Sequence, residues 1–189
     1  MVVGLIVVIV VIVVGILLVL GIGIGTYNSI VSLRNKVDNS WHQIDVQLRK
    51  RYDLIPNLVE TVKGYAAHEK ETLEKVISAR KMGIDAKTVT EQAKAENMIS
   101  DTLKSLFAVS ERYPNLKADT HFSRLMEQLS GIESNIAYAR QFYNDMVMRF
   151  NTRIQTFPGN IFAKMFNFTK KDYFEIEDTA ARGPVKVEF

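Results

Sequence analysis

The stretch RKRYDLIPNLVETVKGY, Arg49–Tyr65, decides the fold of this chain because it places a proline between two segments that both look helical. Ahead of Pro56, apolar side chains recur at steps of three and four residues from Ile30 onward. The same spacing resumes after the proline and continues to Ile77. Such spacing is typical of a helix with one buried face. The chain therefore either turns at Pro56 or bends there within one long helix.

The local chemistry favours the turn. Asp53 would cap a new helix by accepting hydrogen bonds from the amides that follow it, and Pro56 would lie in the first turn of that helix. Inside a single helix the proline would remove one backbone hydrogen bond, at a cost of about 3 kcal/mol. That helix would also reach about 80 Å and leave its far half without enough partner surface. We therefore predict a helix-turn motif at Asp53, Pro56 and Asn57, although oligomerisation would permit the bend.

Two further helices complete an all-α fold. The third begins near Val89 and ends before Pro114, because a proline disfavours the helical conformation of the residue before it. The fourth runs from Phe122 to Ile154, with the heptad-like spacing of a coiled coil. Segments of about 40, 40, 40 and 57 Å would pack side by side in alternating directions. We predict a long-helix antiparallel four-helix bundle over residues 26–157.

Residues 1–25, MVVGLIVVIVVIVVGILLVLGIGIG, contain no charged side chain and predict a transmembrane helix. Such a helix would rise about 35 Å, enough to cross a bilayer. It lacks the basic start and the cleavage site of a signal peptide, so we expect it to remain attached. Basic residues appear only after it, from Arg34, which predicts a single-pass cell-membrane protein with its N-terminus outside and its C-terminal domain cytoplasmic. Gly21 and Gly25 form a G-x-x-x-G pair that would allow self-association.

The composition narrows the functional classes. With 189 residues and 47% hydrophobic side chains, the chain fits one folded domain plus an attachment. The absence of cysteine excludes disulfides, thiolate nucleophiles and thiolate metal sites. The 24 basic and 21 acidic residues give a net charge of +3, which permits contact with anionic lipid but is too little for the basic face that nucleic acid requires.

The last segment, residues 158–189, is a tail rich in aromatic side chains that a complete bundle would not need. We predict a short helix followed by an extended segment. The tail either folds back over one end of the bundle or docks on a neighbouring subunit, and PVKVEF at its end alternates like a strand. The aromatic residues predicted to contact a partner or a second copy are Phe162, Phe166, Phe168, Tyr173 and Phe174.

Several stretches resemble the LemA family of bacterial membrane proteins. They are YNSIVSLRNKVDNSW from Tyr27, IDVQLRKRYDLIPNLVETVKGYAAHE from Ile44, the pair Ala79-Arg80, and RFNTRIQTFPGNIFAKMFNF from Arg149. The resemblance implies one N-terminal span and an inward-facing four-helix bundle, and it supplies no catalytic residues. Relatives are often encoded beside membrane-protein quality-control peptidases, which points to such a peptidase as a partner.

The best candidate for a chemical site is the group Glu60, His68 and Glu69, because imidazole and carboxylate can bind zinc or transfer protons. The sequence HEKE supplies one histidine, whereas a zincin helix supplies two at i and i+4. The chain also lacks the motifs of a phosphate-binding loop, a dinucleotide fold and a nucleophile elbow. We predict no catalytic residue, metal or cofactor, and keep a metal-dependent hydrolase or regulator centred on these three residues as the alternative.

The sequence as a whole predicts a membrane-anchored helical scaffold or adaptor rather than an enzyme. It would self-associate and bind other membrane proteins, and its expected partners are the lipid bilayer, further copies of itself and another membrane protein such as a peptidase. A second alternative is an accessory subunit of a membrane-protein quality-control peptidase.

Overall fold

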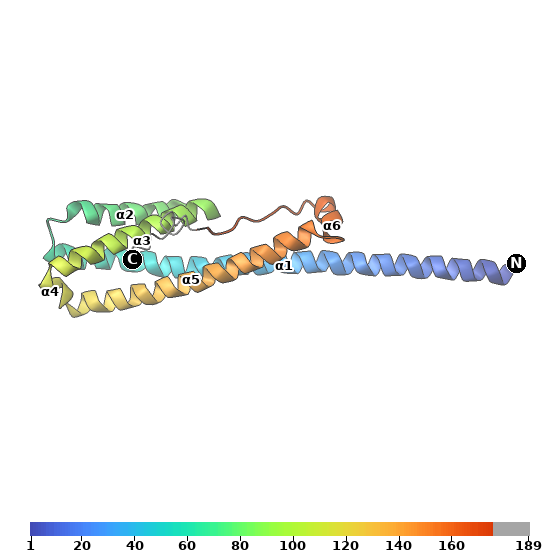
Figure 1. The fold of residues 1–189 in the computed structure, drawn as a ribbon, viewed down its shortest axis with the longest axis horizontal. Coiled ribbons are helices and arrows are strands. Elements are labelled where there is room, and N and C mark those ends of the chain that lie inside the picture. The colour runs from blue at the N-terminus through green and yellow to red at the C-terminus, as the bar shows by residue number, and fades with distance from the viewer. Residues whose placement is uncertain (176–189) are drawn as a thin grey trace, which may run out of the picture. The chain divides into compact units, whose positions relative to one another are not determined.

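A computed structural model describes residues 1–175 of the chain, and these residues form six α-helices (Figure 1). The described residues contain no strand, so the predicted all-α class is confirmed. The strand-like segment predicted at 184–189 lies outside the described residues. The helices are α1 (Val2–Tyr65), α2 (Lys70–Asp85), α3 (Val89–Arg112), α4 (Pro114–Lys117), α5 (Thr120–Gln155) and α6 (Gly159–Met165).

The turn predicted at Pro56 is wrong, because α1 continues through the proline to Tyr65 (Figure 1). The chain turns instead at residues 66–69. A hydrogen bond and the burial of the residues after Pro56 explain why the helix continues. Pro56 cannot donate to the Tyr52 carbonyl one turn earlier, but Arg80 Nε donates to that oxygen at 2.7 Å. The part of α1 after Pro56 was expected to lack packing partners in a single long helix. It does pack against the rest of the chain, since Leu58 and Val62 are fully buried.

The described chain divides into two compact units. Among the described residues, the first consists of Met1–Trp41 and Phe142–Lys171, and the second of His42–Gln141 with residues 172–175. Both α1 and α5 run through the two units. The first predicted helix extends past Pro56 to Tyr65, and most of the second predicted helix is α2, which begins at Lys70. The predicted four-helix bundle itself is not confirmed.

The start of α1 is long and apolar enough to cross a membrane. None of the 18 most apolar consecutive residues in this helix is buried against the rest of the chain. The helix continues past Gly25, so the boundary predicted at residue 25 is not a break in secondary structure. In the first unit, α1 thus begins as an uncovered apolar segment and continues without a break into a segment that packs against the rest of the unit.

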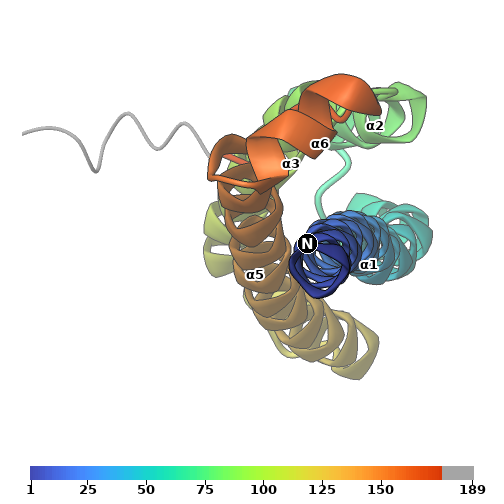
Figure 2. The same ribbon diagram turned by 90° about the vertical axis from the view of Figure 1, so that its right-hand side faces the viewer.

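The packed part of the first unit joins α1 to α5 and α6. Trp41 meets Tyr143 edge to face at 5.5 Å between ring centroids. Figure 2 looks along α1 from its N-terminus and shows α6 lying across the direction of that helix. The tail after α6 is held by Asn151, whose side chain donates to the Lys171 carbonyl and accepts from the Lys171 amide, both at 2.9 Å. The buried apolar residues here are Ile30, Val37, Tyr143, Met146, Val147, Phe150, Ile154 and Ala163.

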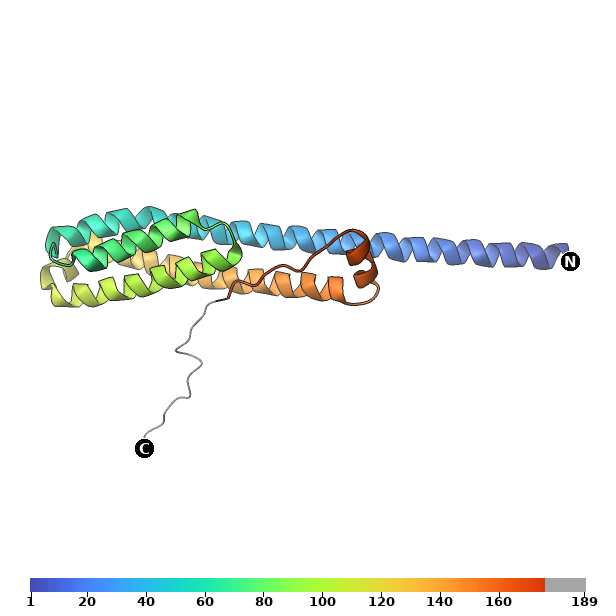
Figure 3. The same cartoon turned by 90° about the horizontal axis from the view of Figure 1, so that it is seen from above.

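In the second unit, α2 and α3 lie side by side and run in opposite directions (Figure 3). Thr88 and Glu91 form a capping box that begins α3, in which each side chain accepts a backbone hydrogen bond of the other residue. The helix ends at Arg112, before Pro114, as predicted. The predicted fourth helix is also present as α5, which ends shortly before Pro158.

Candidate functional site

A buried polar cluster joins α1 to α3 and α5 within the second unit. The Arg51 guanidinium donates from Nη1 to Glu96 Oε2 at 2.9 Å. Its Nη2 lies 2.6 Å from Glu133 Oε2 and donates to Ser100 Oγ at 3.1 Å. The side chains of Arg51 and Glu96 each expose 3% of their surface, whereas the Glu133 side chain is half-exposed. Arg51 is therefore a buried charge whose two carboxylate partners come from different helices.

Tyr52 adds a second set of hydrogen bonds to Glu96. Its hydroxyl donates to Glu96 Oε1 and accepts from Gln92 Nε2, the latter at 2.6 Å. Gly83 on α2 makes room for the ring, because a Cβ at that position would stand 2.5 Å from Tyr52 Oη. Burial raises the pKa of the Tyr52 phenol, and the charge of Glu96 raises it further, so the hydroxyl stays protonated and able to donate.

The cluster is arranged to hold helices together and offers little to a substrate. Burial raises the pKa of the Glu96 carboxyl, against the opposing effects of the Tyr52 hydrogen bond and the Arg51 charge. Both oxygens of Glu96 already accept hydrogen bonds from the protein. A general base needs an oxygen that can reach a substrate proton. The geometry therefore favours a structural role for Glu96.

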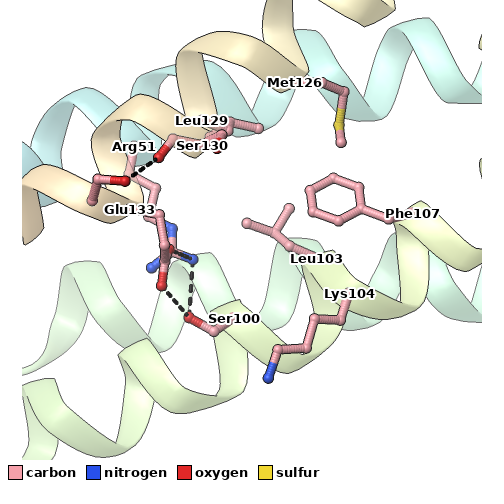
Figure 4. Close-up of a pocket in the computed structure, with 10 residues that line it drawn as sticks. Arg51, Ser100, Leu103, Lys104, Phe107, Met126, Leu129, Ser130 and Glu133 are labelled. Atoms are coloured by element: carbon pink, nitrogen blue, oxygen red, sulfur yellow. Dashed lines mark hydrogen bonds and ion pairs between the residues drawn. The ribbon is translucent and has the colours of Figure 1, made fainter. Parts of the chain in front are cut away.

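An open pocket of about 360 Å³ adjoins the cluster between α3 and α5 (Figure 4). Figure 4 shows Arg51, Glu133 and Ser100 at one end of it, linked by hydrogen bonds and ion pairs. The rest of the lining combines apolar side chains from both helices with the polar side chains of Lys104, Ser130 and Ser134. A space of this size accepts one or two apolar groups of a ligand or a partner chain. These apolar side chains are Leu103 and Phe107 of α3, and Met126 and Leu129 of α5.

The glycine pair predicted for self-association lies on an open face of α1. A Cβ built at Gly21 or at Gly25 meets nothing within 4 Å, so neither glycine is needed for contacts inside the described chain. The glycine that α1 does use is Gly23, where an added Cβ would stand 3.1 Å from Phe162 Cζ of α6. The predicted role of the pair stays a prediction.

The aromatic tail makes contacts within its own chain. Phe166 and Phe168 lie 4.7 and 6.1 Å from the Tyr27 ring, centroid to centroid, and the Arg34 guanidinium lies 5.7 Å from the Phe168 centroid. In the second unit, Phe174 is buried beneath the Arg140 guanidinium, 5.4 Å from its ring centroid. The described part of the tail thus lies against its own chain, and its predicted contact with a partner or a second copy stays a prediction. Of the predicted contact residues, Phe166 and Tyr173 keep much of their surface exposed.

The remaining predicted residues are not assembled into a reactive site. Glu69 lies 3.1 Å from Arg112 Nη2 and accepts from the Tyr113 hydroxyl, which ties the turn after α1 to the end of α3. Glu60 pairs with Lys63 of its own helix. Within residues 1–175, no three His, Asp or Glu side chains are grouped so that they could hold a metal ion. The placement therefore gives the metal-centred alternative no support.

Asp53 and Asn57, predicted as turn residues, are exposed and lie inside the last quarter of α1 rather than at a helix start. The buried polar cluster around Arg51 was not predicted, although the apolar spacing of the sequence indicates it. Arg51 falls three residues after Leu48 and four before Ile55, so it lies on the apolar stripe itself. Gln92 and Glu96 occupy stripe positions of α3 in the same way. Polar residues at core positions of two helices indicate a buried pair, although the sequence does not say which helices meet.

Comparison with known proteins places these residues in a family. The model of the LemA family matches residues 40–189. The chain is similar to magnetosome protein MamQ 2 of Paramagnetospirillum magneticum, with 24% identity over 185 residues, covering 84% of this chain and 68% of that protein. It is also similar to Protein LemA of Metamycoplasma hominis, with 24% identity over 159 residues, covering 82% of this chain and 71% of that protein. A MamQ of Magnetospirillum gryphiswaldense is 22% identical over 185 residues.

Proposed function

This chain belongs to the LemA family, and from that premise we propose that it is a membrane-anchored, non-catalytic adaptor that binds another membrane protein through the pocket between α3 and α5. The pocket is the observation that carries the proposal. Its apolar lining is open to solvent, and the charged groups at its end are fixed by one another. A pocket with these properties suits the binding of an apolar side chain better than the activation of a substrate.

The anchor rests on the exposure of the first residues of α1. Large apolar side chains from Val2 to Ile24 keep about half or more of their surface uncovered. A continuous apolar surface of this length is stable in a lipid bilayer and not in water. The first basic residues after it, Arg34 and Lys36, favour a cytoplasmic location for everything that follows. A partner held in the pocket would therefore be a cytoplasmic segment of a protein in the same membrane.

Two of the compared relatives are named magnetosome proteins and the third is named Protein LemA, and these names specify neither a reaction nor a binding partner. An apolar partner segment that carries a basic group would also find the half-exposed Glu133 carboxylate at the end of the pocket. We expect the anchor residue of such a segment to lie against Phe107 and Met126.

Photo-crosslinking in native membranes tests this proposal. A benzophenone amino acid in place of Ser130, on the rim of the pocket, should form an adduct with an integral membrane protein. Met126→Lys would put a charge into the apolar lining and should lower the adduct about ten-fold, equivalent to about 1.4 kcal/mol.

The matched control for that experiment is Met98→Lys. Met98 lies on α3, is 44% exposed and does not line the pocket, so its substitution should leave the adduct unchanged. Equal adducts in the two variants, or adducts only with soluble proteins, would contradict the proposal. If the partner proves to be a quality-control peptidase, the chain is its accessory subunit.

Self-association is the second part of the proposal, and the open face at Gly21 and Gly25 supports it. Because an added Cβ at these positions meets nothing within 4 Å in the same chain, we expect Gly21→Ile with Gly25→Ile to act mainly on contacts between copies. Light scattering of the detergent-solubilised protein should show an oligomer that this double variant weakens. Gly15→Ile, which is equally unobstructed, is the control. A monomeric native chain would refute self-association.

A further inference from the structure

We propose that α6 and the residues beside it form a second membrane contact, which lies flat in the interface between lipid head groups and acyl chains. This contact involves the first unit only. It rests on the proposed anchor, because the depth of α6 in the membrane follows from the position of the span.

The depth of α6 is fixed by its contacts with α1. Phe162 packs over Gly23, and Phe166 packs on Tyr27 one turn further along. From Val2 to Gly23 the helix rises about 32 Å, close to the thickness of the hydrocarbon core of a bilayer. If α1 crosses the membrane, these contacts hold α6 at the level where the hydrocarbon core ends. Aromatic side chains such as Tyr27 are enriched at that level.

The side chains of this region are apolar and uncovered. Phe157 exposes 79% of its surface, Met165 64%, Ile161 49% and Phe166 48%. Ile161 and Met165 are four residues apart on α6 and so share one face, while Gly159 and Ala163 form a buried face. A short helix with an apolar outer face, placed at the membrane surface, buries that face in the interface. Figure 2 agrees with this geometry, since α6 lies across the direction of α1 and would lie in the membrane plane.

Charge near α6 selects the kind of lipid. An open pocket of about 670 Å³ lies between the end of α5, α6 and the residues that follow, and Lys164 and Lys170 line it together with uncharged polar and apolar side chains. Within residues 1–175, no acidic residue lines this pocket. Basic side chains next to an interfacial helix attract anionic head groups. Among the described residues of the first unit the acidic ones are Asp38 and Asp145, and neither lines this pocket. The surface therefore fits a bilayer containing anionic phospholipid.

Fluorescence quenching in vesicles tests the inference. Because the chain has no cysteine, single variants can be labelled directly with an environment-sensitive nitrobenzoxadiazole dye. The full-length protein is reconstituted into vesicles of phosphatidylcholine and phosphatidylglycerol that contain spin-labelled lipid. Dye at Met165→Cys should lose at least about half of its emission to the lipid quencher, since it lies at the interface. Dye at Met98→Cys, 44% exposed on α3, should not be quenched.

Two further variants separate the possible failures. Dye at Val19→Cys reports whether the span itself is inserted. Quenching at Val19→Cys without quenching at Met165→Cys would overturn the interfacial contact and leave the anchor standing, whereas no quenching at either site would overturn both. Lys164→Glu combined with Lys170→Glu should reduce quenching at Met165→Cys in vesicles with phosphatidylglycerol. Apolar emission at Met165→Cys without lipid quenching would indicate contact with another copy and would also overturn the inference.

Discussion

At the scale of single residues, Arg51 organises the polar contacts of the second unit. It is buried, and it touches Glu96 and Ser100 of α3 and Glu133 of α5. A buried ion pair gains little overall relative to a well-packed apolar pair, but removing one partner leaves an uncompensated charge inside the protein. The cluster therefore specifies which helix faces meet, and its loss should be costly.

Arg51→Ala should lower the free energy of unfolding by about 3–5 kcal/mol, because Glu96 would remain buried without its cation. Arg49→Ala is the matched control. Arg49 pairs with Asp45 on the exposed surface of the same helix, so its loss should cost no more than about 0.5 kcal/mol. Guanidinium denaturation of the detergent-solubilised chain, followed by circular dichroism, gives both values. Similar losses of unfolding free energy for the two variants would contradict the prediction that the buried Arg51–Glu96 pair matters more than an exposed pair.

The sequence revealed this cluster only in part. The basic run Arg49, Lys50 and Arg51 reads most simply as a solvated face, and two of its three residues are indeed exposed. The orientation of Arg51 follows from its place on the apolar stripe, and its choice of partner follows from tertiary packing. Glu96 lies 45 residues away along the chain. Periodicity within one helix carries no information about a partner at that separation.

At the scale of elements, α1 shows how a tertiary contact overrides a local signal. Pro56 removes one donor from the helix, and Arg80 of α2 replaces it by donating to the Tyr52 carbonyl. The ring of the proline lies on the exposed side of α1, where it displaces no packing. Both Pro56 and Arg80 belong to the stretches that resemble the LemA family. We infer that the two residues act together to keep α1 unbroken.

A double-mutant cycle measures this coupling. Arg80→Ala should destabilise the chain by about 1–3 kcal/mol, because it leaves the Tyr52 carbonyl without a donor. In a Pro56→Ala background the new backbone N–H can fill that position, so the same Arg80→Ala change should cost less. Lys81→Ala, an exposed change on the same helix, should have no such dependence. Equal losses from Arg80→Ala in both backgrounds would show that Arg80 does not act through the carbonyl.

Element ends were predictable where the signal was local. The end of α3 before Pro114 and the extent of α5 follow from a proline and from an unbroken apolar stripe. The break between α1 and α2 was not predictable in this way. The sequence offers Asp53 and Pro56 as a start signal, while the actual turn at residues 66–69 contains neither glycine nor proline. Glu69 of this turn contacts Arg112 and Tyr113 at the end of α3, more than 40 residues away along the chain, and a local pattern carries no information about such contacts.

At the scale of the whole molecule, the proposed function needs both a membrane anchor and a binding pocket. The family and the all-α class were predicted from the sequence and are confirmed. The pocket was not predicted, because it depends on how side chains of α3 and α5 meet. The proposed adaptor function requires a cytoplasmic location of the pocket, where segments of other membrane proteins would reach it.

Cysteine accessibility in spheroplasts tests this central claim most directly, since the chain contains no cysteine of its own. A membrane-impermeant maleimide should label Val2→Cys from outside, near the start of the span. It should label Lys36→Cys and Lys63→Cys, both exposed on α1 beyond the span, only after the membrane is opened. Labelling of Lys63→Cys in sealed spheroplasts would place the pocket-bearing domain outside the cell and contradict the account.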